Sequence, residues 1–265
     1  MKVHAFGDED APKLLLLPGT CCDWRGNFGR VIPLLADEFR VLCVSYDGFE
    51  ETETSTFPTM LEETEKIEAY IGEHCGGAVR AVYDCSLGGS FAGLLAAREN
   101  VRIDYAILGS SDLDQSSPLA AKLRAAILIP MIYPLIRDGK FSAGFLQNRA
   151  EKMRREDPEY IGAFMDMFGG ARAYVSRESC KNQFVSDLVT PLPDGIAPKK
   201  CEIHIFYALK MGEKYRARYE KHFAHPVIHE QDLRHEELLA RYPDEWAALV
   251  KQIARGKGKT ADATI

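Results

Sequence analysis

The sequence lacks an excess of positive charge, because its 33 Lys and Arg residues are outnumbered by 39 Asp and Glu residues. The formal net charge is -6 at pH 7 over 265 residues. Such a chain has no broad basic field to attract nucleic acid or an anionic membrane surface. We therefore expect no nucleic acid and no membrane as partners, and we expect a small-molecule substrate. The sequence does not indicate an oligomeric state.

Targeting and membrane segments are also missing. Residues 1–10 carry several charges and no apolar run of the kind found in secretory signals. The most apolar stretch, Leu119 to Ile136, is interrupted by Lys122, Arg124 and two prolines, whereas a membrane helix needs roughly 18–20 apolar residues. We expect a helical segment of a soluble protein here, and a cytoplasmic location.

The sequence lacks the cysteine pattern of a disulfide framework, since its seven cysteines are odd in number and scattered. The adjacent pair Cys21 and Cys22 has no second pair and no histidine at the spacing of a zinc site. We expect reduced thiols, no metal and no cofactor. A nucleotide-binding Rossmann domain is a further alternative, but it would need a glycine-rich turn after the first strand, and Pro18-Gly19-Thr20 offers a single glycine.

Short continuous apolar runs alternate with longer amphipathic segments, a pattern that predicts a mostly parallel sheet with helices on both faces, an α/β fold. The predicted strands are Lys13–Leu17, Arg40–Ser45, Val79–Asp84, Ile103–Leu108, Glu202–Tyr207 and Pro226–His229. An acidic helix is expected from Leu61 to His74, and a closing helix from Glu236 to Ile253.

Strand signals disappear between Ser110 and about Lys199 and helical patterns replace them. The sequence therefore predicts an α/β core formed by residues 1–114 and 200–255, an inserted helical cap over 115–199, and a frayed tail over 256–265. The cap helices are expected over Pro118–Leu128, Ala143–Arg155, Pro158–Phe168 and Ala173–Leu188.

Ser86 stands where the apolar strand Val79–Asp84 runs directly into a helix with small residues along one side. In a G-x-S-x-G elbow the serine occupies a strained turn that projects its hydroxyl above the sheet. Gly88 fits the position after the serine, and Cys85 is expected to point into the core. The Leu87 amide and the start of the helix can stabilise an oxyanion.

These features resemble the α/β-hydrolase family over essentially the whole chain, although Asp84 replaces the usual first glycine of the elbow. The turn Pro18-Gly19-Thr20 is similar to the family's His-Gly-x turn, with Pro18 in place of the histidine. By this resemblance the Thr20 amide is the second oxyanion donor. His235, in the segment between the last strand and the final helix, matches the family's catalytic histidine. Its chain order after Ser86 agrees with that pattern.

The acid of a catalytic triad is harder to place, because Met211 occupies the position where the resemblance calls for a carboxylate. Glu213, two residues further, and Asp112, in the loop after Ile103–Leu108, are equal candidates. A third possibility is that no acid exists and the site is a dyad or is inactive. Glu236 and Glu237 are expected to face solvent on the closing helix.

The resemblance implies a serine hydrolase, esterase-like, that forms an acyl-enzyme on Ser86 and acts on a small, apolar carboxylic ester or related acyl compound. Apolar and aromatic residues of the cap favour such a substrate: Ile127, Leu128, Met131, Ile132, Tyr133, Leu135, Phe141 and Phe145. Dehalogenation is disfavoured because it needs a carboxylate at position 86. The alternative is a catalytically silent homologue that binds a small ligand or partner protein, suggested by Asp84, Pro18 and Met211.

Overall fold

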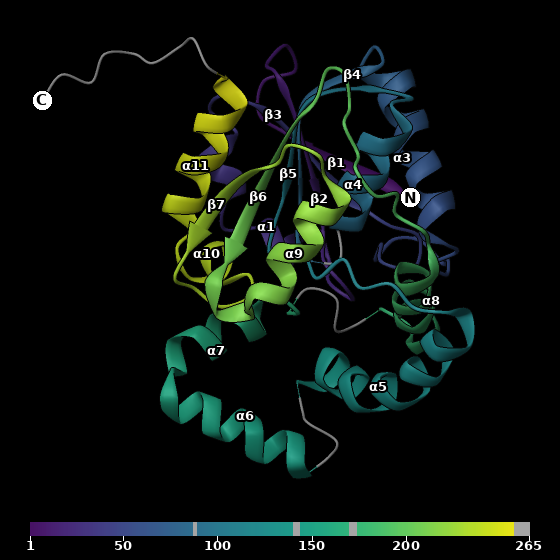
Figure 1. Ribbon diagram of the computed structural model, residues 1–265, viewed down its shortest axis with the longest axis vertical. Helices are drawn as coiled ribbons and strands as arrows, with labels where there is room; N and C mark the ends of the chain where they lie inside the picture. The colour runs from purple at the N-terminus through teal and green to yellow at the C-terminus, as the bar shows by residue number, and fades with distance from the viewer. Residues whose placement is uncertain (87–88, 140–143, 170–173, 257–265) are drawn as a thin grey trace, which may run out of the picture.

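The computed structural model describes residues 1–86, 89–139, 144–169 and 174–256. Its centre is a seven-stranded sheet in the order β1-β3-β2-β4-β5-β6-β7 (Figure 1). All neighbouring strands are parallel except the pair formed by β1 and β3. The strands span Lys2–Phe6 (β1), Lys13–Leu17 (β2), Arg40–Ser45 (β3), Ala78–Asp84 (β4), Arg102–Leu108 (β5), Glu202–Ala208 (β6) and Val227–Gln231 (β7).

The central strands are apolar at consecutive positions because both faces of the sheet are covered. In β2, Leu14 and Leu16 pack into one hydrophobic core, while Leu15 and Leu17 pack into the other. A half-exposed strand would alternate apolar and polar residues instead. The prediction of a mostly parallel sheet covered on both faces is confirmed. The antiparallel edge strand β1 was not predicted, because its side chains are only partly buried and carry no continuous apolar run.

Two sets of helices cover the two faces. The first set, α3 (Met60–His74), α4 (Gly89–Arg98) and α9 (Glu213–His222), contributes to one core. The second, α1 (Trp24–Phe28), α2 (Ile32–Leu35) and α11 (Pro243–Arg255), contributes to the other. In Figure 1, α11 lies on one side of the sheet, and α3 and α4 lie on the opposite side.

Four helices separate β5 from β6: α5 (Pro118–Asp138), α6 (Gly144–Glu156), α7 (Pro158–Asp166) and α8 (Arg177–Val189). Figure 1 shows α5, α6 and α7 beyond the carboxyl ends of the strands, at the bottom of the view. Helix α5 is longer than predicted, since it continues past two internal prolines to Asp138 and is capped by Gly139, whose φ is 66°. The predicted helices from Ala143 and from Ala173 begin later among the described residues, at Gly144 and Arg177.

Two sequence expectations need correction. The closing helix is two helices, α10 (Glu237–Arg241) and α11, because Pro243 starts a new helix after Tyr242. Helix α5 is also long and apolar enough to cross a membrane by length and composition, although it is the only such helix in the described part of the chain. Our expectation that no stretch approaches this composition was therefore too strict.

Candidate active site

Ser86 lies on the sharp turn between β4 and α4, and its φ of 56° is in the left-handed region that non-glycine residues seldom occupy. The turn is crowded by the loop after β2. A Cβ added to Gly19 would lie 3.0 Å from the Cys85 carbonyl oxygen and 3.4 Å from the Ser86 Cβ. Gly19 thus lets the two loops approach closely. Such strain is typical of functional sites.

The His235 ring reaches Ser86 from the segment between β7 and α10, with 2.9 Å between Ser86 Oγ and His235 Nε2. Helix α7 supports this histidine. The Tyr160 hydroxyl donates to the His235 carbonyl oxygen at 3.1 Å, and the Phe164 ring contacts the imidazole edge-on with 6.2 Å between centroids. The two residues that the sequence singled out are therefore hydrogen-bonded neighbours.

The structure places neither candidate acid beside this histidine. Glu213 is exposed at the start of α9, and Asp112 is exposed in the loop after β5. The Asp112 carboxylate accepts a hydrogen bond from the Asp114 amide at 3.3 Å. At the position of Met211 the chain forms a short 3-10 helix, Leu209–Met211. Within the described ranges, no carboxylate is hydrogen-bonded to the His235 ring.

Glu236 is buried beneath the nucleophile turn, so the expectation that it faces solvent is wrong. Its side chain is 3% exposed. Its carboxylate accepts hydrogen bonds from the Ser86 amide at 2.8 Å, the Ser110 amide at 2.8 Å and the Tyr83 hydroxyl at 3.2 Å. Its own φ is 53°. Glu236 therefore joins the histidine segment to the serine turn and to the loop after β5.

Glu237 is also buried, contrary to expectation. Its carboxylate accepts a hydrogen bond from the Arg234 amide at 2.8 Å and pairs with Arg241 at 3.3 Å. This pairing closes the segment that carries His235 into a compact turn. No sequence pattern distinguished either glutamate, because two glutamates directly after His235 look like the polar start of a helix.

Asp84, which replaces the usual glycine of the elbow, is fully buried. Its Oδ2 accepts a hydrogen bond from the Ala92 amide at 2.8 Å, so it bonds to the first turns of α4. Its Oδ1 has no hydrogen-bond partner among the described residues. Burial raises the pKa of this carboxyl well above its ordinary value, and the nearby Asp187 and Glu236 add to the effect. Asp84 is accommodated under the helix.

The loop after β2 presents a free backbone donor at Thr20. Its neighbours are engaged, since the Gly19 amide donates to Asn27 Oδ1 and the Cys21 amide donates to Gln183 Oε1, each at 2.8 Å. The Thr20 amide forms no hydrogen bond with any part of the chain that the structure describes. The other predicted donor, Leu87, and the predicted Gly88 lie outside the described residues.

A cavity of about 270 Å³ opens above Ser86. Most of its wall is apolar, and it combines the β2 loop, the serine turn, α5, α7 and the histidine segment: Gly19, Thr20, Cys21, Cys22, Cys85, Ser86, Ile132, Leu135, Ile136, Phe164, Met167, Phe168, His235 and Glu236. Of the predicted cap residues, Ile132 and Leu135 thus reach the cavity. Phe141 and the Phe145 side chain lie outside the described residues.

The cavity's three cysteines do not rival Ser86 as nucleophiles. Cys85 is buried in the core as expected, although it also borders the cavity. Burial raises the pKa of the Cys22 and Cys85 thiols. The pKa of Cys21 is raised chiefly by its hydrogen bond with the Cys180 side chain, and then by burial. Since the thiolate is the reactive form, these side chains are poor nucleophiles at neutral pH.

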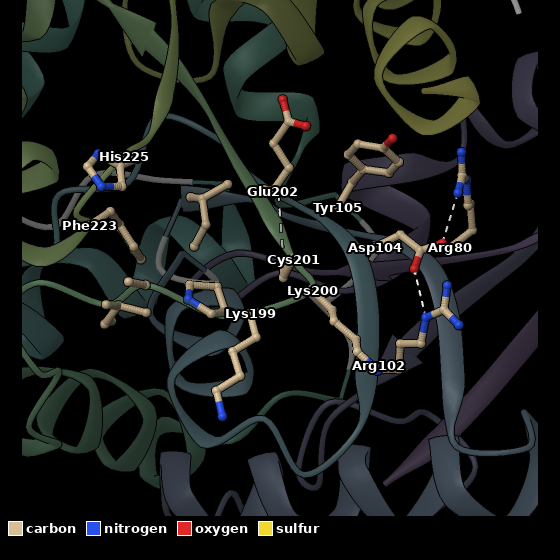
Figure 2. Close-up of a pocket in the computed structure, with 14 residues that line it drawn as sticks. Arg80, Arg102, Asp104, Tyr105, Lys199, Lys200, Cys201, Glu202, Phe223 and His225 are labelled. Carbon is tan, nitrogen blue, oxygen red and sulfur yellow. Dashed lines mark hydrogen bonds and ion pairs between the residues drawn. The ribbon is translucent and has the colours of Figure 1, made fainter. Parts of the chain in front are cut away.

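A second cavity, of about 570 Å³, lies at the opposite, amino edge of the sheet (Figure 2). There Asp104 pairs with Arg80 at 2.8 Å and with Arg102 at 3.0 Å, as the dashed lines show. Burial raises the pKa of the nearby Cys201 to about 12. This cavity therefore offers a charged wall without an activated nucleophile. In the described ranges no three His, Cys, Asp or Glu residues form a group that could hold a metal.

The sheet order, the serine turn after β4 and the histidine after β7 together define the α/β-hydrolase fold. Many solved structures share it. A protein from Desulfitobacterium hafniense described as of the alpha/beta hydrolase family matches with a TM-score of 0.78 and 20% identity, over 95% of this chain and 99% of that one. An enol-lactonase from Burkholderia xenovorans LB400 matches with a TM-score of 0.69 and 17% identity, over 96% of each chain.

A thermophilic esterase from Thermogutta terrifontis matches with a TM-score of 0.67 and 20% identity, over 96% of this chain and 92% of that one. Comparison of the sequence with models of known families gives no match, and comparison with curated proteins gives no significant one. At these identities the likeness shows the fold, and the activity has to be argued from the site.

Proposed function

We propose that this protein is a serine hydrolase that cleaves a small, apolar carboxylic ester or related acyl compound through an acyl-enzyme on Ser86. The observation that carries the proposal is the 2.9 Å contact between Ser86 Oγ and His235 Nε2 at the floor of an apolar cavity. Nucleophile and base within hydrogen-bond distance are what acyl transfer requires. The esterase and the lactonase that share the fold also act on ester bonds by their names, which supports this class.

In this mechanism His235 Nε2 takes the proton of the Ser86 hydroxyl while Oγ attacks the acyl carbon. The negative charge that develops on the carbonyl oxygen is stabilised by the Thr20 amide, which has no partner among the described residues and borders the cavity. His235 then gives its proton to the leaving alcohol. Water, deprotonated by His235, then attacks the acyl carbon; the bond to Ser86 Oγ breaks, His235 returns the proton to Oγ, and the acid is released.

We infer a Ser-His dyad, because no described carboxylate bonds to the His235 ring. Helix α7 helps to position the imidazole in place of an acid, because Tyr160 donates a hydrogen bond to the His235 carbonyl and Phe164 packs against the His235 ring. Loss of the correct acid interaction in a serine protease costs roughly 10⁴ in kcat. We therefore expect slow turnover. The same observation favours the second candidate, a catalytically silent homologue that binds a small apolar ligand in this cavity.

Covalent labelling separates these two candidates. A fluorophosphonate probe should label the wild type, with the adduct on Ser86 by mass spectrometry, and Ser86→Ala should remain unlabelled. Ser116→Ala is the matched control, since Ser116 lies outside the cavity and should label normally. His235→Ala should slow labelling and the hydrolysis of short p-nitrophenyl esters by at least 100-fold. His74→Ala, on the exposed end of α3, should change neither rate.

Labelling of Ser86→Ala at the wild-type rate would eliminate Ser86 as the nucleophile. A folded wild type that neither reacts with the probe nor hydrolyses the esters would favour the silent ligand-binding protein. We also propose a cytoplasmic location, which is supported by seven cysteines that are all unpaired in the structure.

A further inference from the structure

Helix α5 turns an apolar face to solvent. Leu119, Leu123 and Ile127 follow one another at intervals of four residues, which places them along one side of a helix. They are 80%, 64% and 58% exposed. The opposite side of the helix is the packed one, with Ala121 and Ala125 buried toward the body of the protein. The exposed stripe is therefore not needed to hold the helix in place.

This arrangement is the reverse of an ordinary surface helix, which buries its apolar stripe and exposes charges. Leu128 of the same helix is also exposed, and the other large, exposed apolar side chains in the described part of the chain lie on other elements, at Leu61, Leu209 and Val227. Scattered residues of that kind are normal, whereas a contiguous apolar face marks an interaction site.

Cations border the stripe. Lys122 of α5 and Lys181 of α8 both line the cleft between these helices, and Arg177 lines a second cleft along the same boundary. None of the three forms an ion pair with another described residue. Arg124, on the other flank, pairs with Asp114. Glu178 lines the second cleft beside Arg177, and the Glu62 carboxylate accepts a hydrogen bond from Thr59 at the edge of the first. An apolar face with basic residues beside it is the pattern of a helix that lies in a membrane interface.

We propose that the outward face of α5 docks on an anionic bilayer surface, with Leu119, Leu123 and Ile127 at the boundary of the acyl chains and with Lys122 and Lys181 at the headgroups. The charge complementarity selects a bilayer as the occupant. A second copy would present the same apolar stripe with the same cations on one side, and on the other side Asp114 is already paired with Arg124 and Arg218, so it offers no free acidic surface to complement them.

This proposal departs from the expectation, drawn from the net charge of -6, that no membrane is a partner, but the net charge does not oppose docking through one local surface. Screening confines the interaction of exposed charges to about 10 Å at 0.1 M ionic strength. The cations beside the stripe therefore contribute more to the attraction to an anionic surface than the distant acidic residues do. Anionic lipids are typical of the cytoplasmic leaflet. The same helix lines the cavity with Ile132, Leu135 and Ile136, which would bring the cavity close to lipid-soluble acyl compounds. The docking itself does not depend on the proposed hydrolase activity.

Vesicle flotation of the whole protein tests the proposal. The wild type should float with vesicles of phosphatidylcholine and phosphatidylglycerol and much less with phosphatidylcholine alone. The double variant Leu123→Asp with Ile127→Asp should bind at least tenfold more weakly. Lys122→Gln with Lys181→Gln should bind roughly thirtyfold more weakly, about fivefold per cation. Val227→Asp, at an exposed apolar position on the edge strand β7, is the matched control and should bind like the wild type.

Circular dichroism should show the same fold for all variants, because every substituted side chain is exposed. Absence of wild-type binding to anionic vesicles, or equal binding of the Asp double variant, would overturn the proposal. Light scattering that shows a dimer dissociated by the Asp substitutions would also overturn it, in favour of a second copy. Flotation needs no turnover, and fluorophosphonate labelling reports the active site separately, so failure of one proposal is distinguishable from failure of the other.

Discussion

Removal of the Glu236 carboxylate should destabilise the protein and its nucleophile turn together. In Glu236→Ala the Ser86 and Ser110 amides lose their common acceptor, and the Tyr83 hydroxyl loses its partner. A buried polar group without a partner costs about 1–3 kcal/mol, and relief of burying a charge offsets part of the total. We therefore expect unfolding free energy to fall by about 2–5 kcal/mol, or a Tm lower by roughly 4–20 °C.

The amide isostere distinguishes hydrogen bonding from charge. In Glu236→Gln the amide oxygen can accept from both backbone amides, since a single oxygen, Oε1, already accepts both. The amide nitrogen can donate to the Tyr83 hydroxyl, which then accepts instead of donating. We expect this variant to stay within about 1 kcal/mol of the wild type and to keep at least a tenth of its labelling rate.

Scanning calorimetry gives the Tm of each variant, and fluorophosphonate labelling well below that Tm reports the serine turn. Glu236→Ala should label at least tenfold more slowly than the wild type, because the positive φ of Ser86 is no longer held by a hydrogen bond at its amide. An alanine variant with wild-type Tm and labelling would refute the reasoning. Equal losses in the glutamine and alanine variants would show that charge, and not the hydrogen bonds, is what matters.

Two further predictions concern the same neighbourhood. Gly109→Ala should lower the urea midpoint sharply, because the added Cβ would lie 2.6 Å from Glu236 Oε1 and 2.8 Å from the Asp84 carbonyl oxygen. The control is Gly162→Ala, inside α7, where an added Cβ has no atom within 4 Å. This control should be neutral or stabilising by about 1 kcal/mol. Asp84→Asn should raise Tm relative to the wild type by an amount that grows as pH rises above about 4, where an unfolded aspartate ionises. The raised pKa keeps the folded carboxyl protonated while the unfolded chain ionises near pH 4, so wild-type stability falls as pH rises; a constant difference would contradict this.

Much of the fold was predictable because its signals are local. The continuous apolar runs of β2 and β3 can be buried only if both faces of the sheet are covered, and the turn residues around them fix where the strands end. Ser86 was predictable for the same reason, since a strand, a serine and a helix of small residues are adjacent in sequence. His235 was identified through the resemblance to the α/β-hydrolase family, whose histidine follows the last strand, and the structure places this segment beside the serine turn.

The support of the site was not predictable, because it is made by contacts between distant segments. Glu236 meets amides at positions 86 and 110, and no periodicity in the sequence links these positions. A charged residue at the start of a predicted helix ordinarily faces solvent, so the sequence pattern predicted an exposed Glu236. The extra hydrogen-bond donors at this site make burial favourable, and only the assembled structure brings them together.

The helices between β5 and β6 therefore line the cavity and also position the histidine. Helix α7 holds the histidine through Tyr160 and Phe164, in a site where no described carboxylate bonds to the imidazole. Helix α5 supplies a wall of the cavity and carries the exposed stripe. If an acid fixed the imidazole from the sheet, the histidine would be independent of these helices. Here its support from α7 couples the proposed chemistry to the packing of the inserted segment, whose outer face is the one we propose to meet lipid.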